Sequence, residues 1–158
     1  GGALNHAAEY LRGDEPVLVH NVDIMSTINL DEALESHKNN GAIATLICNS
    51  RNSSRHLLAI DGDLNAWENT TNGARKPDFT DHERENMQPF SFSGIHILSP
   101  SIFPYLKEYS DKVGAKFSVI DFYLDLCRKE KVSIYQTDGV VFDCGKIETI
   151  AQAEQVFK

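Results

Sequence analysis

The sequence predicts an α/β fold, in which a sheet carries helices on both of its faces. Segments with a helical period alternate with segments rich in Val, Ile and Leu, and this alternation runs through most of the chain. The chain has 158 residues, of which 41% are hydrophobic and 24% are charged, which is an ordinary globular composition. We therefore expect one domain over residues 1–158, which need not be a complete one.

The first part of the chain predicts two successive helix–strand steps. Residues 3–11 place their apolar side chains on one helical face, and the apolar segment 17–19 follows as a buried strand. Residues 30–37 predict a second helix, which Gly41 ends before a second buried strand, 42–49.

A hairpin and a long loop are expected next. Asp61 and Gly62 lie between two segments of strand character, and an Asp-Gly pair in that position favours a tight turn. Residues 68–88 are polar and predict a long loop with weak structure, of the kind that is often functional.

The second half of the chain continues the alternation of strands and helices. The expected elements are a strand at 90–98, helices at 100–108 and 117–129, strands at 132–136 and 140–144, and a closing helix at 148–157.

Charge and cysteine content narrow the functional classes. A net charge of −8 argues against an extended basic surface that binds nucleic acid or an anionic membrane, although a local basic pocket could bind a phosphate. Cys48, Cys127 and Cys144 form no CxxC pair and no zinc-binding pattern, which fits a reducing compartment. The sequence also has no signal-peptide core and no apolar segment long enough to span a bilayer. We therefore expect a soluble cytoplasmic protein.

Two acids follow predicted strands and are the strongest candidates for chemistry. Asp23 comes just after the strand 17–19, and Asp143 ends a strand near the C-terminus. In α/β sheets ligands gather at the carboxyl ends of strands, where two carboxylates could share one divalent ion. Mg²⁺ suits such a site because it takes a few carboxylate oxygens and fills its other positions with water and substrate phosphates. The alternative interpretation is that each Asp forms a turn or caps a helix.

Four stretches resemble the sugar-1-phosphate nucleotidyltransferase family, and they occur in that family's order. They are GGAL at 1–4, LVHNVDI at 18–24, FSFSGIHILSPSIF at 90–103 and FDCGKIETIAQAE at 142–154. The resemblance covers the whole chain. It implies a Rossmann-like, mixed, mostly parallel sheet, the nucleotide-diphospho-sugar transferase fold. The family's opening glycine-rich loop, with its Arg, and its Lys segment are not found in these residues. The resemblance thus implies the C-terminal part of a longer, N-terminally incomplete domain that is inactive alone.

The resemblance also implies a reaction and a set of site residues. The substrates would be a nucleoside triphosphate and a sugar 1-phosphate, and Mg²⁺ the cofactor; the matching motifs are common to uridylyl, guanylyl and thymidylyl transfer. Asp23 and Asp143 would bind the metal and would be the only catalytic groups within these residues. Gly1, Gly2 and Asn21 would contact the nucleotide. Gly94 and Lys76 would contact the sugar phosphate.

Each of the weaker assignments has an alternative. Terminal glycines can simply be disordered, Gly94 can mark a β-bulge, and Lys76 can be only solvated. Val22, Lys146 and Ile147 depart from the family pattern, which allows a non-catalytic nucleotide-sugar-binding or regulatory module. A third possibility is an α/β piece that self-associates through an exposed sheet edge at the strand 17–19.

Overall fold

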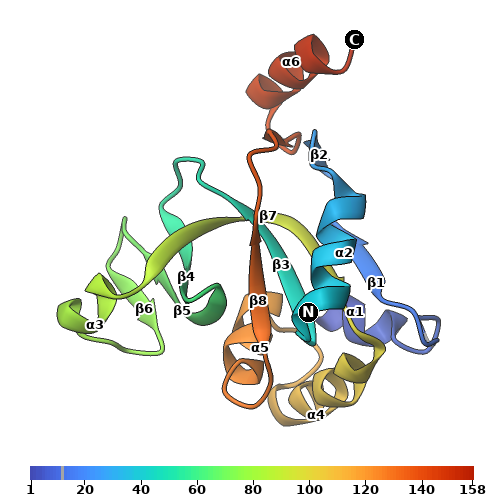
Figure 1. Ribbon diagram of the computed structural model, residues 1–158, viewed down its shortest axis with the longest axis vertical. Coiled ribbons are helices and arrows are strands. Elements are labelled where there is room, and N and C mark those ends of the chain that lie inside the picture. Colours follow the sequence, from blue (N-terminus) through green and yellow to red (C-terminus); the bar gives the residue numbers. More distant parts are fainter. Residues whose placement is uncertain (12) are drawn as a thin grey trace.

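The computed structural model describes residues 1–11 and 13–158 and shows a curved sheet with helices packed around it (Figure 1). The strands are β1 (Val17–His20), β2 (Ile24–Ser26), β3 (Ala44–Asn49), β4 (Arg55–Ile60), β5 (Asp63–Asn69), β6 (Ala74–Lys76), β7 (Gln88–Leu98), β8 (Val132–Gln136) and β9 (Val141–Asp143). The helices are α1 (Gly2–Ala7), α2 (Leu30–Asn40), α3 (Asp81–Glu85), the 3-10 helix η1 (Pro100–Ile102), α4 (Phe103–Val113), α5 (Val119–Leu126) and α6 (Ile147–Val156). The mixed α/β class expected from the sequence is confirmed.

The two faces of the sheet build two separate apolar cores. Side chains alternate between faces along a strand, so Leu46 and Cys48 of β3 join the larger core, which α4 and α5 cover. Ile47, between them, points to the other face and packs in the smaller core with Ala33 of α2. All four residues are fully or almost fully buried. The expectation of helices on both faces is therefore correct.

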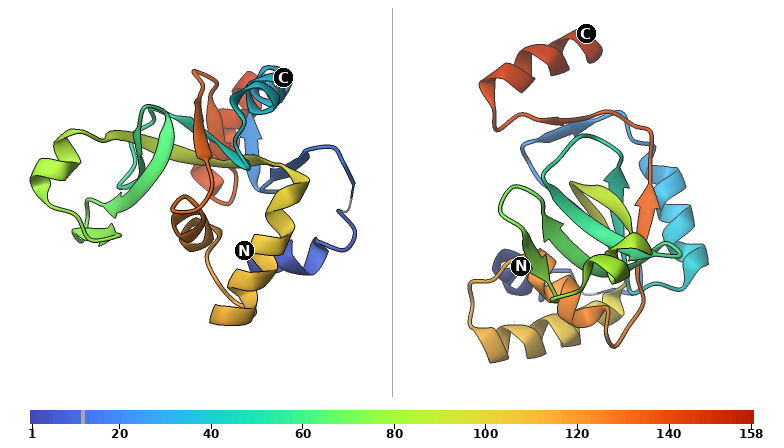
Figure 2. Two further views of the ribbon diagram at one scale, coloured as in Figure 1. Left: turned by 60° about the horizontal axis from the view of Figure 1, so that its bottom comes forward. Right: turned by 90° about the vertical axis from the view of Figure 1, so that its left-hand side faces the viewer.

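The main sheet is mostly antiparallel, which corrects the prediction of a Rossmann-like, mostly parallel sheet. Within the described residues, β3–β8 is the parallel pair, and every other pairing of the main sheet is antiparallel. The strand order is β1-β7-β3-β8-β5-β4, and β4 pairs again with β7, so that five strands form a closed cycle. Figure 2 shows the resulting curvature of the sheet.

The short connection between β4 and β5 accounts for part of this difference. The turn at Asp61 and Gly62 has φ of 52° and 83°, as a two-residue hairpin turn requires, and the predicted hairpin is confirmed. A connection of that length can join only antiparallel strands, whereas a parallel pair needs a long crossover. The alternation of helix and strand in the sequence does not reveal strand direction.

Strand β1 lies at the edge of the main sheet and is not the buried strand that its apolar sequence predicts. It pairs with β7, and its residues alternate between partly buried and exposed. Leu18 is 46% exposed. An apolar run of three residues does not distinguish a central strand from an edge strand.

Residues 68–88 are more ordered than predicted. They include the end of β5, strand β6 and helix α3. The side chain of Thr80 accepts a hydrogen bond from the Glu83 amide, and the Glu83 carboxylate accepts one from the Thr80 amide. This capping box has a recognisable pattern, Thr followed three residues later by Glu, which marks the start of a helix.

Helix α6 lies beyond the main sheet and packs against β9 (Figure 1). Ala153 is its buried residue, whereas Ile147 is 83% exposed. Among the described residues, no helix is both long and apolar enough to cross a membrane.

A histidine in the larger core carries a pH-sensitive contribution to stability. The Nδ1 atom of His96 lies 2.6 Å from the hydroxyl oxygen of Tyr123, and His96 is 4% exposed. Burial, with a smaller contribution from the positive N-terminus, lowers the pKa of His96 from 6.5 to about 4.

The free energy of unfolding is therefore expected to fall as the pH is lowered from about 6.5 to about 4. In that range the unfolded chain binds a proton at this position and the folded chain does not, so the contribution is complete above pH 6.5 and lost on acidification. The full loss from this residue is on the order of 3 kcal/mol. Urea unfolding at several pH values should show that the free energy of unfolding depends less steeply on pH in His96→Gln than in the wild type. Equal pH dependence in the two proteins would contradict a lowered pKa of His96.

Candidate functional site

Asp23 and Asp143 are brought together by the small β2–β9 pair. Asp23 lies in the turn before β2, and Asp143 is the last residue of β9. The two strands pair antiparallel, with Ile24 opposite Asp143. In addition, the amide of Cys144 donates a hydrogen bond of 2.7 Å to the main-chain oxygen of Asp23. Two acids from opposite ends of the sequence therefore sit next to each other.

The carboxylates of these two acids border one small space beside Gly145. A Cβ atom built on Gly145 would lie 3.1 Å from Oδ1 of Asp143 and 3.4 Å from Oδ2 of Asp23. The amide of Gly145 also donates to Oδ1 of Asp143 at 3.2 Å. Because residue 145 has no side chain, no Cβ atom occupies the position that lies close to both carboxylates.

The donor set suits Mg²⁺ better than a metal that requires several protein ligands. In the described part of the chain, no three His, Cys, Asp or Glu side chains gather where they could hold a metal. Two carboxylates leave the other coordination positions to water and phosphate oxygens, which Mg²⁺ prefers. The ammonium of Lys146, 4.0 Å from Oδ2 of Asp143, neutralises part of the charge.

Asn21 and Gly94 lie against each other near this pair of acids. The amide of Asn21 donates to the carbonyl oxygen of Gly94 at 3.1 Å. Gly94 has φ of +81° and lies at a bulge, where the β3–β7 register shifts. A Cβ atom on Gly94 would be 2.9 Å from Nδ2 of Asn21, so the Asn21 carboxamide covers this face of the glycine. The structure thus gives Gly94 the bulge position that the sequence left as its alternative role.

Gly1 and Gly2 lie elsewhere. A Cβ atom on Gly1 would be 2.2 Å from the ring of Phe117, and one on Gly2 would be 2.0 Å from the carbonyl oxygen of Ala115. Both glycines therefore pack against the connection between α4 and α5, and the N-terminus is well separated from β2 in Figure 1. The structure does not bring them together with Asp23.

Lys76 also has a different neighbour. Its ammonium lies 2.8 Å from Oδ1 of Asp121 on α5 and 5.7 Å from the centre of the Trp67 ring. Within the described residues Lys76 is thus part of an ion pair, and it lies on β6, apart from the two metal-binding candidates.

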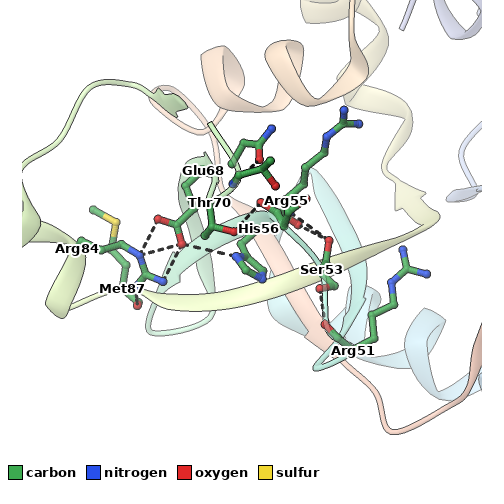
Figure 3. Close-up of polar contacts among 12 residues, drawn as sticks. Arg51, Ser53, Arg55, His56, Glu68, Thr70, Arg84 and Met87 are labelled. Atoms are coloured by element: carbon green, nitrogen blue, oxygen red, sulfur yellow. Dashed lines mark hydrogen bonds and ion pairs between the residues drawn. The ribbon is translucent and has the colours of Figure 1, made fainter. Parts of the chain in front are cut away.

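A partly buried ion pair on β5 was not predicted from the sequence. Figure 3 shows that the Arg84 guanidinium faces the Glu68 carboxylate, with distances of 2.8–3.0 Å from Nε and Nη2 to its oxygens. The hydrogen bond from Arg84 is the largest cause that lowers the pKa of Glu68. His56 Nδ1 lies 3.6 Å from Oε1 of Glu68. The pair attaches α3 to the sheet. The alternation along β5 could have indicated a buried carboxylate, because Glu68 shares the buried face with Leu64 and Ala66.

Comparison with solved structures shows which fold this is. A protein assigned as a glucose-1-phosphate thymidylyltransferase from Bacillus anthracis, in complex with sucrose, matches with a TM-score of 0.70 and 16% identity, over 98% of this chain and 58% of that one. UDP-glucose pyrophosphorylase complexed with UDP-glucose gives 0.64 and 19%, over 98% and 61%. The chain has the sugar-1-phosphate nucleotidyltransferase fold.

A further structure with this nucleotidyltransferase fold agrees. HddC from Yersinia pseudotuberculosis, complexed with GMP-PN, has a TM-score of 0.63 at 21% identity, over 99% of this chain and 61% of that one. No protein-family model and no curated protein sequence matches the chain. The chain spans 58–61% of the length of these three structures. The family resemblance of the sequence is therefore confirmed at the level of the fold.

Proposed function

We propose that the full-length protein is a sugar-1-phosphate nucleotidyltransferase, which converts a nucleoside triphosphate and a sugar 1-phosphate into a nucleoside diphosphate sugar and pyrophosphate. The observation that carries this proposal is the meeting of Asp23 and Asp143 at Gly145 in a chain with this fold. One compared structure holds UDP-glucose and another holds GMP-PN, which supports a nucleotide or a nucleotide sugar as the ligand.

The reaction requires positioning and charge neutralisation more than proton transfer. An oxygen of the sugar phosphate attacks the α-phosphorus of the triphosphate, and pyrophosphate leaves in line. Asp23 and Asp143 would hold Mg²⁺ at the space beside Gly145. When bound there, Mg²⁺ would supply positive charge that neutralises phosphate oxygens.

The binding of the triphosphate tail is proposed to need residues outside these 158. The sequence contains no GxGxxG and no GxxxxGK[ST] stretch that could cradle a polyphosphate with backbone amides. We therefore propose that this chain alone is inactive and that its acids act together with a phosphate-binding loop on another part of the protein.

A non-catalytic nucleotide-sugar-binding module is the second candidate. It is favoured by the Lys146 ammonium beside Asp143, because a positive side chain at this carboxylate competes with a cation. Both candidates predict a bound nucleotide sugar, and only the first predicts turnover.

Pyrophosphate release by the full-length protein separates the two candidates. The assay would combine UTP, GTP or dTTP with glucose, mannose or N-acetylglucosamine 1-phosphate, in the presence of Mg²⁺ and after its removal with EDTA. Release that requires Mg²⁺ and both substrates supports the transferase. Nucleotide-sugar binding by calorimetry, without pyrophosphate from any combination, would instead establish the binding module.

A further inference from the structure

Arg51 lies at the same edge of the sheet as the two acids. Strands β1 and β3 both run antiparallel to β7, with Val17 and Ala44 both opposite Leu98, and β8 runs parallel to β3. The carboxyl ends of β1, β3 and β8 therefore lie along one edge of the sheet. This edge is formed by strand ends and differs from the lateral edge at β1. The chain leaves the edge formed by strand ends toward Asp23 after β1, toward Arg51 after β3, and toward Asp143 after β8.

The backbone and the guanidinium of Arg51 are both held in place. The amide of Arg51 donates to Oδ1 of Asn49 at 3.3 Å, and its carbonyl oxygen accepts from the Ser91 hydroxyl at 2.9 Å. Nη2 of Arg51 donates to the carbonyl oxygen of Phe92 at 2.9 Å. A guanidinium has five N–H donors, so this contact orients the group and leaves donors for a ligand. Orientation in advance reduces the entropy lost when a phosphate binds.

The contact with Phe92 also connects Arg51 to the acids. Phe92 precedes Gly94 by two residues on β7, and Gly94 lies against Asn21, two residues before Asp23. The guanidinium is thus linked to Asp23 through its hydrogen bond to Phe92, the contact between Gly94 and Asn21, and two short stretches of chain.

The charge around Arg51 is unusual for this acidic protein. In a chain with a net charge of −8, no Asp or Glu occurs between Glu35 and Asp61, and that stretch contains Lys38, Arg51 and Arg55. Within residues 1–11 and 13–158, Arg75, Lys76 and Arg84 form ion pairs with carboxylates, whereas Arg51 and Arg55 form none. Figure 3 shows that the Arg51 side chain extends away from the Glu68–Arg84 pair.

We propose that Arg51 binds a phosphate group of the substrate at the Asp23–Asp143 site, the role that the sequence assigned to Lys76. This inference rests on the proposed function. A guanidinium suits the role because it can donate two parallel hydrogen bonds to a phosphate. The phosphate belongs either to the sugar 1-phosphate or to the polyphosphate of the nucleotide.

Calorimetric binding to the full-length protein tests the proposal and distinguishes the two sources. The probes are glucose 1-phosphate and inorganic tripolyphosphate, each in the presence of Mg²⁺. Arg51→Gln is expected to weaken one of them by about tenfold, because a charge-assisted hydrogen bond is lost. Arg51→Lys keeps the positive charge but lacks the paired N–H donors of the guanidinium, so it should bind with intermediate affinity. It also provides the test if Arg51→Gln does not fold. The affected probe identifies the phosphate.

Arg55→Gln is the matched control, because Arg55 adds the same charge a few residues away and has an exposed side chain. It is expected to change affinity less than twofold at physiological salt. Three outcomes overturn the proposal: wild-type protein that binds neither probe, equal affinities in wild type and Arg51→Gln, or an equal loss in Arg55→Gln. Weaker phosphate binding in Arg51→Gln, in a protein that releases no pyrophosphate, would uphold the inference and reject the transferase.

Discussion

Replacing Asp143 or Asp23 by Asn is expected to lower pyrophosphate release by the full-length protein on the order of 10²- to 10³-fold, the range typical for loss of one group that stabilises transition-state charge. Asn has nearly the shape of Asp and lacks its negative charge. Each variant thus removes one of the two carboxylates that border the space at Gly145. Mn²⁺, a probe for the Mg²⁺ site, should bind at least about tenfold more weakly to either variant.

Two further variants sharpen this test. Asp138→Asn removes an exposed carboxylate from the segment before β9 and should leave Mn²⁺ binding and turnover close to wild type. Gly145→Ala keeps both acids and places a methyl group 3.1 Å from Asp143 Oδ1 and 3.4 Å from Asp23 Oδ2, where it should exclude the ion. Electron paramagnetic resonance of free Mn²⁺ gives the affinities. Undiminished Mn²⁺ binding in the Asp23 and Asp143 variants would reject the shared site.

Replacing Arg84 by Met is expected to lower the free energy of unfolding by about 2–3 kcal/mol, the largest stability effect foreseen for a single side chain outside the two cores. The change leaves Glu68, whose side chain is 10% exposed, without its hydrogen-bonded partner. Loss of one member of a fully buried pair costs about 3–5 kcal/mol, and the 25% exposure of Arg84 reduces that figure. Urea unfolding followed by circular dichroism measures the difference.

The contribution of this pair also depends on pH in a defined direction. Arg84 lowers the pKa of Glu68, so the stabilisation is complete above the ordinary carboxyl pKa and is lost as the pH falls through the lowered value. The matched control is Arg75→Met, whose partner Asp81 has a side chain that is 88% exposed. That exposed pair should contribute less than about 1 kcal/mol. An Arg84→Met variant as stable as the control would show that Glu68 is solvated in the folded protein.

The positions of most helices and of the β4–β5 turn could be predicted because their signals are local, whereas α3 was predicted as part of a loop. Asp61 and Gly62 produced the expected hairpin, and Gly41, with φ of 69°, ends α2 as expected. The direction of the strands could not be predicted in this way. Pairing of β7 with β1, β3 and β4 is set by long-range packing, and no residue of β7 encodes which of these neighbours it will meet.

The candidate site shows the same division between local and long-range information. The sequence predicted that Asp23 and Asp143 meet at the carboxyl ends of two separate strands of one α/β sheet. In the structure a different arrangement joins them, since the three-residue strands β2 and β9 pair outside the main sheet. No pattern in the sequence predicts β2. The ion pair of Lys76 was equally hidden, because Asp121 reaches it only through the packing of α5.

The separateness of the β2–β9 pair has a consequence for ligand affinity. A two-stranded ribbon is only marginally stable by itself in water. This ribbon holds both acids and depends on the packing of Ile24 and Val141 against the smaller core. Local opening of the ribbon would separate the carboxylates while the barrel-like cycle of strands stayed folded. An incoming cation would then shift the population toward the closed ribbon, and its observed affinity would include the cost of that ordering. Substitutions that stiffen the ribbon could thus tighten metal binding without touching a ligand atom.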